Sequence, residues 1–123
     1  MIQNKAELKE YLDADYLVIK NLGRRSVCWK YMKLLRKTEY YENTGRKLRG
    51  RLYHHWLNKM QVYTGISIKP NNFGKGLGLF HTGSIVVNTT ARFGDWCVIQ
   101  NNVNVAANVR GGGVCLSRSR LLC

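Results

Sequence analysis

An apolar residue recurs at every sixth position over much of the second half of this 123-residue chain. A period of six fits neither an α-helix, which repeats about every 3.6 residues, nor a simple strand, which repeats every two. A second apolar series, offset by two positions, runs through Val87, Phe93, Ile99 and Val105. The first series consists of Phe73, Leu79, Ile85, Ala91, Cys97, Val103 and Val109.

This repeat predicts a parallel β-helix, in which each six-residue unit supplies one short strand and a corner. Three units form one coil, and stacked coils bury a shared interior. The regular pattern dissolves after Val109, so we expect about two coils, spanning residues 73–108. Asparagine tolerates left-handed backbone angles and therefore suits the corners. The candidate corner residues are Asn71, Asn72, Asn88, Asn101, Asn102, Asn104 and Asn108.

The first half of the chain has helical spacing instead. Residues 5–12 predict a short helix, and Ser26 is a plausible N-cap for a longer one that ends near Glu42. A third helix is predicted over residues 46–60, where apolar residues recur every four positions. This stripe consists of Leu48, Leu52, Trp56 and Met60, widened by Tyr53 and Leu57.

The sequence therefore predicts an α plus β-solenoid fold in three parts. A basic helical segment occupies residues 1–63, and the hexapeptide-repeat β-helix occupies residues 64–110. Residues 111–123 lack the repeat, and we expect them to be irregular and foreign to the fold.

Charge is concentrated in the helical part. The net charge is +13, and twelve basic residues between Lys20 and Lys59 face only Glu39 and Glu42. Such a block attracts nucleic acid, anionic lipid or a nucleotide-bearing cofactor, or else it forms a solvated helical face. Aromatic residues interleaved with this charge could stack on bases, but core packing is the expected role. They are Trp29, Tyr31, Tyr40, Tyr41, Tyr53 and Trp56.

Composition also bears on the compartment and on metals. The chain has no apolar run long enough to span a membrane, and its first residues are charged, so we expect no membrane association. Its four cysteines form no C-x-x-C pair, and only three histidines accompany them, so no metal site is expected. We expect a cytoplasmic protein with free thiols.

Three segments of the repeat region resemble the hexapeptide-repeat serine O-acetyltransferases and their relatives in surface-polysaccharide gene clusters. These are residues 65–68 (GISI), 70–77 (PNNFGKGL) and 81–88 (HTGSIVVN). Residues 35–41 (LRKTEYY) and the basic helix after them are similar to the helical N-terminal segment of that family. The resemblance covers roughly residues 26–110, and it implies a left-handed parallel β-helix that assembles as a homotrimer.

The resemblance also implies a reaction, the transfer of acetyl from acetyl-CoA to a hydroxyl of serine or of a related small acceptor such as a sugar. His81 matches the histidine that acts as general base in that family, and an imidazole that titrates near neutral pH suits this role. Ala106, Ala107 and Asn108 match the backbone segment of the acetyl-CoA groove. His54 and His55 lack such a context, and we interpret both as surface or packing residues.

The chain departs from the family pattern at the expected partner of His81. The family places an aspartate where it can orient the imidazole, but the aligned residues here are Ser67 and Ile68. Phe80 stands where the serine enzymes often have an acidic residue, which leaves the acceptor open.

Three classes of function therefore remain open at this point. The first is an O-acetyltransferase with His81 as base. The second is a non-catalytic oligomerisation or interaction module built on the same fold. The third, a basic nucleic-acid-binding protein, rests on the charge block alone, because the sequence contains no recognisable motif for DNA or RNA binding.

Overall fold

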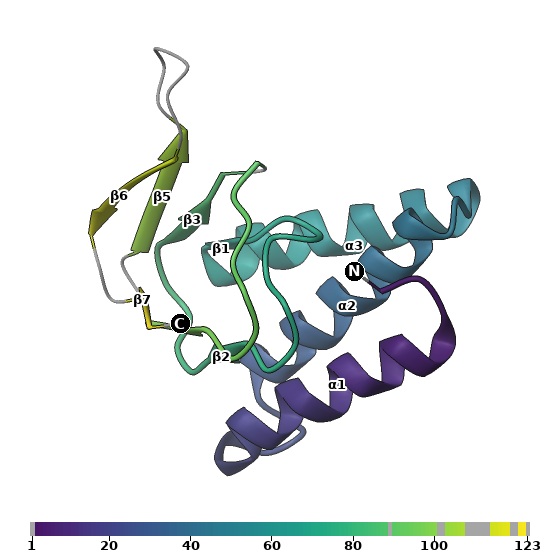
Figure 1. The fold of residues 1–123 in the computed structure, drawn as a ribbon, viewed down its shortest axis with the longest axis horizontal. Coiled ribbons are helices and arrows are strands. Elements are labelled where there is room, and N and C mark those ends of the chain that lie inside the picture. Colours follow the sequence, from purple (N-terminus) through teal and green to yellow (C-terminus); the bar gives the residue numbers. More distant parts are fainter. Residues whose placement is uncertain (1, 89, 101–102, 108–113, 119–120, 123) are drawn as a thin grey trace.

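Three helices precede seven short strands in the computed structural model, which describes residues 2–88, 90–100, 103–107, 114–118 and 121–122 (Figure 1). The helices are α1 (Lys5–Ile19), α2 (Val27–Asn43) and α3 (Lys47–Thr64), with a short 3₁₀ turn at Lys20–Leu22. The strands are β1 (Ile66–Ser67), β2 (Gly78–Leu79), β3 (Ile85–Val87), β4 (Val98–Ile99), β5 (Val103–Ala107), β6 (Val114–Arg118) and β7 (Leu121–Leu122).

Local signals set the helix ends. The side chain of Ser26 accepts a hydrogen bond from the backbone N–H of Trp29 at 3.2 Å, which confirms the predicted N-cap of α2. Gly65 ends α3 in the left-handed conformation with φ 74°. The prediction for α1 was too short, since the helix continues past residue 12 to Ile19. Burial of Asp15 and Ile19 supplies the tertiary packing that extends it.

Three sets of parallel contacts follow one another along the chain and then recur: the β1–β3–β5 pairings, the Phe73–Phe93 bridge and the β2–β4 pairing. Strand β3 pairs with β1 through Ile66↔Ile85 and with β5 through Ile85↔Val103, while β2 pairs with β4. Between these two sheets, Phe73 and Phe93 form an isolated parallel bridge, and their rings stack with centroids 4.8 Å apart. Partners lie 18 to 20 positions apart along the chain. Such intervals are compatible with a three-sided coil, but the solenoid itself, its handedness and its number of coils all stay predictions.

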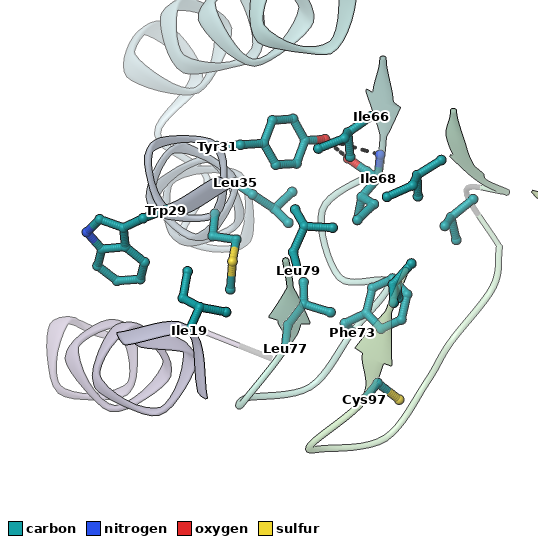
Figure 2. Close-up of a cluster of buried hydrophobic side chains, with 14 of the residues drawn as sticks. Ile19, Trp29, Tyr31, Leu35, Ile66, Ile68, Phe73, Leu77, Leu79 and Cys97 are labelled. Atoms are coloured by element: carbon teal, nitrogen blue, oxygen red, sulfur yellow. Dashed lines mark hydrogen bonds between the residues drawn. The ribbon is translucent and has the colours of Figure 1, made fainter. Parts of the chain in front are cut away.

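The predicted interior series is buried wherever the structure describes its side chains. Phe73, Leu79, Ile85, Ala91 and Cys97 are all buried, whereas the side chains of Val103 and Val109 lie outside the described residues. Helices α1 and α2 contribute further members of the same hydrophobic core, among them Ile19, Trp29 and Leu35 (Figure 2). The six-residue period therefore identified inward-facing positions correctly.

A buried ion cluster joins the helices to the first coil. Arg36 on α2 is fully buried, and its Nε donates to a carboxylate oxygen of Asp15 on α1 at 2.6 Å. Its Nη1 lies 3.2 Å from the carboxylate of Glu39. The guanidinium also donates to the carbonyl oxygens of Phe73 at 3.0 Å and of Gly74 at 2.6 Å. One side chain thus contacts two helices and the coil.

The two carboxylates of this cluster bind the coil as well. Asp15 accepts from the backbone N–H of Leu77 at 2.9 Å, and Glu39 accepts from that of Asn71 at 3.1 Å. Burial raises the pKa of both carboxyl groups, against the opposing charge of Arg36. Burial acts to lower the pKa of Arg36, but Glu39 and Asp15 outweigh it and raise that pKa. The three charges therefore depend on one another.

A buried tyrosine and a buried asparagine fix two further points. The hydroxyl of Tyr31 donates to the carbonyl oxygen of Ile68 at 3.2 Å and accepts from the N–H of the same residue at 3.1 Å (Figure 2). Burial raises the pKa of Tyr31 to about 12. The amide of Asn72 accepts from the N–H of Lys69 and donates to the carbonyl of Ala91 one coil later. Beside it, Asn71 adopts the left-handed angle predicted for the corner asparagines, with φ 67°. Asn72 and Asn88 do not adopt it, whereas Trp96 does, with φ 61°.

Half of the apolar stripe of α3 is exposed, including Trp56, for which core packing was expected. Leu57 is buried, but Leu48, Leu52 and Trp56 are exposed. Helix α3 packs against α2 and β1, and the residues buried by this contact are Gly50, Leu57 and Thr64. The apolar period was read correctly, but half of that face points away from the rest of the protein. Of the interleaved aromatic residues, Trp29, Tyr31 and Tyr40 are buried as expected.

Residues 111–123 were expected to be irregular, and this is wrong for the two strands described there. Strand β6 pairs antiparallel with β5, and β7 pairs antiparallel with β4. Without β6 and β7, the outer edges of β5 and β4 would have unpaired backbone N–H and C=O groups. Such an edge can pair with a strand that runs in either direction. That these residues are foreign to the fold stays a prediction.

One cysteine departs from the expectation of free thiols. Cys28 is free and buried, whereas Cys97 is disulfide-bonded. Disulfides are rare in reducing compartments, so this bond weighs against the predicted cytoplasmic location. No helix in the described part of the chain is long and apolar enough to cross a bilayer.

We expect Arg36→Leu to lower the free energy of unfolding by about 3–5 kcal/mol, because it leaves the buried carboxyl groups of Asp15 and Glu39 without a cation. Urea denaturation followed by circular dichroism measures this change. Lys33→Leu, one turn away at an exposed position, is the matched control and should change it by less than about 0.5 kcal/mol. Equal stability of the two variants would contradict the role given to Arg36.

We expect Tyr31→Phe to cost about 1–3 kcal/mol, because the variant leaves the buried N–H and C=O of Ile68 without the hydroxyl. The same denaturation experiment measures it. Tyr63→Phe removes a hydroxyl from a side chain that is 76% exposed and should be neutral. A loss of stability in Tyr63→Phe as large as in Tyr31→Phe would refute this assignment.

Candidate functional site

His81 lies at a corner of the coil, in the turn that joins β2 to β3. Its side chain is exposed. The strands on either side of the turn belong to different sheets, so the chain changes direction here. The corner therefore presents the imidazole to solvent, where a small molecule can reach it.

The end of α3 supports the turn that carries His81. The N–H of Gly83 donates to the carbonyl oxygen of Thr64 at 3.0 Å, and the N–H of Ile85 donates to that of Gly65 at 3.1 Å. The two glycines approach so closely that a Cβ on Gly65 would lie 3.0 Å from the carbonyl oxygen of Gly83. Only a residue without a side chain combines this approach with a positive φ.

No described side chain orients the imidazole. Among residues 2–88 and 90–100, His81 takes part in no hydrogen bond or ion pair. Ser67 is half-buried on β1, and Ile68 is buried beside Tyr31, so neither aligned position supplies a carboxylate. An exposed imidazole can still accept a proton from a hydroxyl placed next to it. Its orientation would then come from the acceptor or from another chain.

The residues predicted to bind acetyl-CoA lie away from His81 along the same sheet. Ala106 and Ala107 form the end of β5, and Asn108 lies outside the described residues. His81 precedes the first residue of β3, whereas Ala106 and Ala107 continue beyond the part of β5 that pairs with β3. In Figure 1 these strands run in the same direction, so the two groups occupy opposite ends of the sheet. One chain does not bring them together.

Strand β6 pairs with the predicted acetyl-CoA segment. Its residues Cys115 and Val114 lie opposite Ala106 and Ala107. Backbone groups along that edge of β5 are therefore directed toward β6. No pattern in the sequence predicted this pairing, because the tail lacks the six-residue repeat.

The other histidines lie on α3, apart from the coil. The Nε2 of His54 lies 3.2 Å from the carboxylate of Glu42, and the side chain of His55 is exposed. Both are surface residues, as predicted. Among the described residues, no three histidine, cysteine, aspartate or glutamate side chains are grouped so that they could hold a metal ion.

Several hollows lie on the helical part and beside Phe73 and Phe93, and His81 lines none of these among the described residues. A surface hollow of about 370 Å³ is lined by residues of α2 and α3, and one of about 400 Å³ is lined mainly by residues of α1 and α2. A smaller one of about 240 Å³ lies beside Phe73 and Phe93. The α2–α3 hollow is lined by Lys30, Lys33, Leu34, Lys37, Tyr53, Trp56 and Met60. Aromatic residues interleaved with basic ones were the sequence signal for this surface.

No protein-family model matches the chain, and it has no match among curated proteins or solved structures. Any function assigned to it therefore rests on its own motifs and geometry.

We expect Gly65→Ala to destabilise the protein by about 1–3 kcal/mol, because the new Cβ combines a positive φ with a close approach to Gly83. Thermal unfolding measures the loss, and the amide resonance of Gly83 should shift as its bond to Thr64 is strained. Gly94→Ala is the matched control, since a Cβ there meets no atom within 4 Å. Equal effects of the two substitutions would show that the turn does not depend on Gly65.

Proposed function

We propose that the chain is an O-acetyltransferase of the hexapeptide-repeat type, which transfers acetyl from acetyl-CoA to a hydroxyl of serine or of a related small acceptor. His81 is the general base. The fold in this proposal is a left-handed parallel β-helix of about two coils behind a helical segment. The proposal keeps the cytoplasmic location expected from the sequence, and the disulfide at Cys97 is the observation that opposes this location.

The repeating order of parallel contacts carries the proposal. Pairings at intervals of 18 to 20 residues are those expected when three six-residue units, or slightly longer ones, form each coil. The motif that resembles the acetyltransferases places His81 at an accessible corner of this arrangement. A fold alone does not define a function, so the assignment of an acetyltransferase activity depends on His81 and its surroundings.

The chemistry assigned to His81 is a proton transfer. Its imidazole takes the proton of the acceptor hydroxyl while the oxygen attacks the thioester carbonyl carbon of acetyl-CoA. The new carbon–oxygen bond forms as the carbon–sulfur bond breaks. The departing CoA sulfur then receives a proton, and the products are an acetyl ester and free CoA.

Separation of the two predicted groups favours an assembly. His81 and the segment of Ala106 and Ala107 lie at opposite ends of one sheet, so an active site containing both needs them from different copies. The proposed homotrimer supplies such neighbours. Because β6 pairs with Ala106 and Ala107, an acetyl-CoA molecule bound at this segment would lie next to β6.

A specific observation favours the second candidate, a non-catalytic oligomerisation or interaction module. His81 has no bonded partner among the described residues, and a base that nothing orients contributes little. Under this alternative the chain assembles but does not bind acetyl-CoA. Sedimentation and calorimetric titration with acetyl-CoA separate the two candidates.

We expect the protein to release free CoA from acetyl-CoA in the presence of L-serine or a sugar acceptor, and His81→Ala to reduce the rate about 10²–10⁴-fold. A thiol reagent measures the release, with a protein-only blank for the cysteines of the chain. His55→Ala, which removes an exposed histidine from α3, should retain full activity.

Equal rates for the protein and His81→Ala would remove His81 from the mechanism. Absence of turnover with every hydroxyl acceptor, together with absence of acetyl-CoA binding, would overturn the proposed activity and favour the interaction module.

A further inference from the structure

Helix α3 presents a large apolar face to solvent. The side chains of Leu48, Val62 and Tyr63 are 85%, 90% and 76% exposed, and Leu52 and Trp56 are exposed as well. Exposed apolar residues occur singly on most proteins, but a contiguous group of this kind marks an interaction surface. These five residues define what we call the α3 face.

The five side chains share one side of the helix. Successive residues of a helix are rotated by about 100°, which places the group within an arc of about 120°. Leu48 and Tyr63 are separated by about 22 Å along the axis, since each residue rises about 1.5 Å. His55 and Lys59 fall within the same arc, and a lysine can extend its amine away from an apolar surface. The face is therefore a stripe along almost the whole helix.

Positive charge flanks this stripe. Lys47 and Arg51 lie along one edge, and Arg49 lies along the other. Beyond Trp56, across the hollow of about 370 Å³, Lys30, Lys33 and Lys37 on α2 continue the basic surface.

Negative charge is scarce nearby. Helix α3 contains no acidic residue, and α2 contains two, of which Glu39 is buried. The other, Glu42, lies beside His54. A second copy of this chain is therefore a poor occupant of the α3 face, because contact between two such faces would bring basic residues together. A partner that fits this face has an apolar region to contact the stripe and negative charge on either side of it to contact the basic residues.

We propose, against the sequence-based expectation of no membrane association, that the α3 face binds the surface of an anionic membrane, with the helix parallel to the bilayer plane. Leucine, valine, tryptophan and tyrosine enter the boundary between headgroups and acyl chains, while the flanking lysines and arginines contact lipid phosphates. A basic amphipathic helix with aromatic and aliphatic residues on its apolar side is the arrangement that lies in such an interface.

Two features favour lipid over other polyanions. Nucleic acid binds through phosphate contacts and stacking on aromatic rings. Neither interaction would bury the exposed aliphatic side chains of Leu48 and Val62. The stripe lies along a convex helix, and a fluid bilayer adapts to a convex surface without requiring a matching groove. The proposal is independent of the acetyltransferase activity, because His81 takes no part in it.

Flotation with vesicles tests the proposal on the full chain. We expect binding to phosphatidylcholine vesicles that contain about one third phosphatidylglycerol, little binding to pure phosphatidylcholine, and loss of binding at high salt. The double variant Leu48→Glu/Leu52→Glu should weaken binding about tenfold or more, since it removes the apolar contact at exposed positions. Leu17→Glu, at an exposed leucine of α1, should bind like the unchanged protein.

Tryptophan fluorescence reports which face enters the lipid. We expect a blue shift on addition of the anionic vesicles, which Trp56→Phe abolishes and Trp96→Phe retains. Trp56 and Trp96 are both exposed, but Trp96 lies outside the helical segment, so the pair is matched. His81→Ala should bind vesicles normally, which separates this result from the acetyltransferase test.

Several outcomes would overturn the proposal. Absence of binding to anionic vesicles would do so, as would binding that the double variant leaves unchanged, because charge alone would then explain it. Binding to an oligonucleotide but not to vesicles would assign the face to nucleic acid. An oligomer that the double variant dissociates, without vesicle binding, would assign it to a second copy.

Discussion

The fold depends on how the open end of the first coil is closed. The first strand of a solenoid leaves one edge of backbone groups without a neighbouring strand, and buried unpaired groups are costly. Here Arg36 donates to two carbonyl oxygens of that coil, while Asp15 and Glu39 each accept from a backbone N–H. Tyr31 bonds both backbone groups of Ile68. Side chains of α1 and α2 thus bond the backbone groups at this edge, which explains why charged groups lie in the interior.

The other end of the solenoid is closed differently. Strands β6 and β7 pair antiparallel with β5 and β4, so backbone partners there come from the tail and not from helices. The same antiparallel pairing involves Ala106 and Ala107, the residues that the family resemblance assigns to acetyl-CoA. Closure of this edge and cofactor binding therefore concern the same strand. In the described residues, the two edges of the parallel strands are thus closed by different means, helix side chains at one edge and antiparallel strands at the other.

The features of this structure that could be predicted from the sequence are those set by single residues or by short-range spacing. The six-residue period reports which side chains face inward, and Phe73 to Cys97 are buried accordingly. The N-cap at Ser26 and the left-handed angle at Asn71 follow from single residues. Burial of Arg36 could not be predicted, because Glu39 is its one nearby partner, and Asp15 and the carbonyl oxygens of Phe73 and Gly74 are distant in the chain. The exposure of α3 was missed for a related reason: periodicity identifies an apolar face but not what covers it.

Helix α3 links the two proposed functions. Its last residue, Thr64, accepts the hydrogen bond that positions the turn of His81, and the exposed Val62 and Tyr63 immediately precede it. The same helix end thus supports the proposed base and belongs to the proposed lipid-binding face. Under both proposals the acetylation site would lie near a membrane surface.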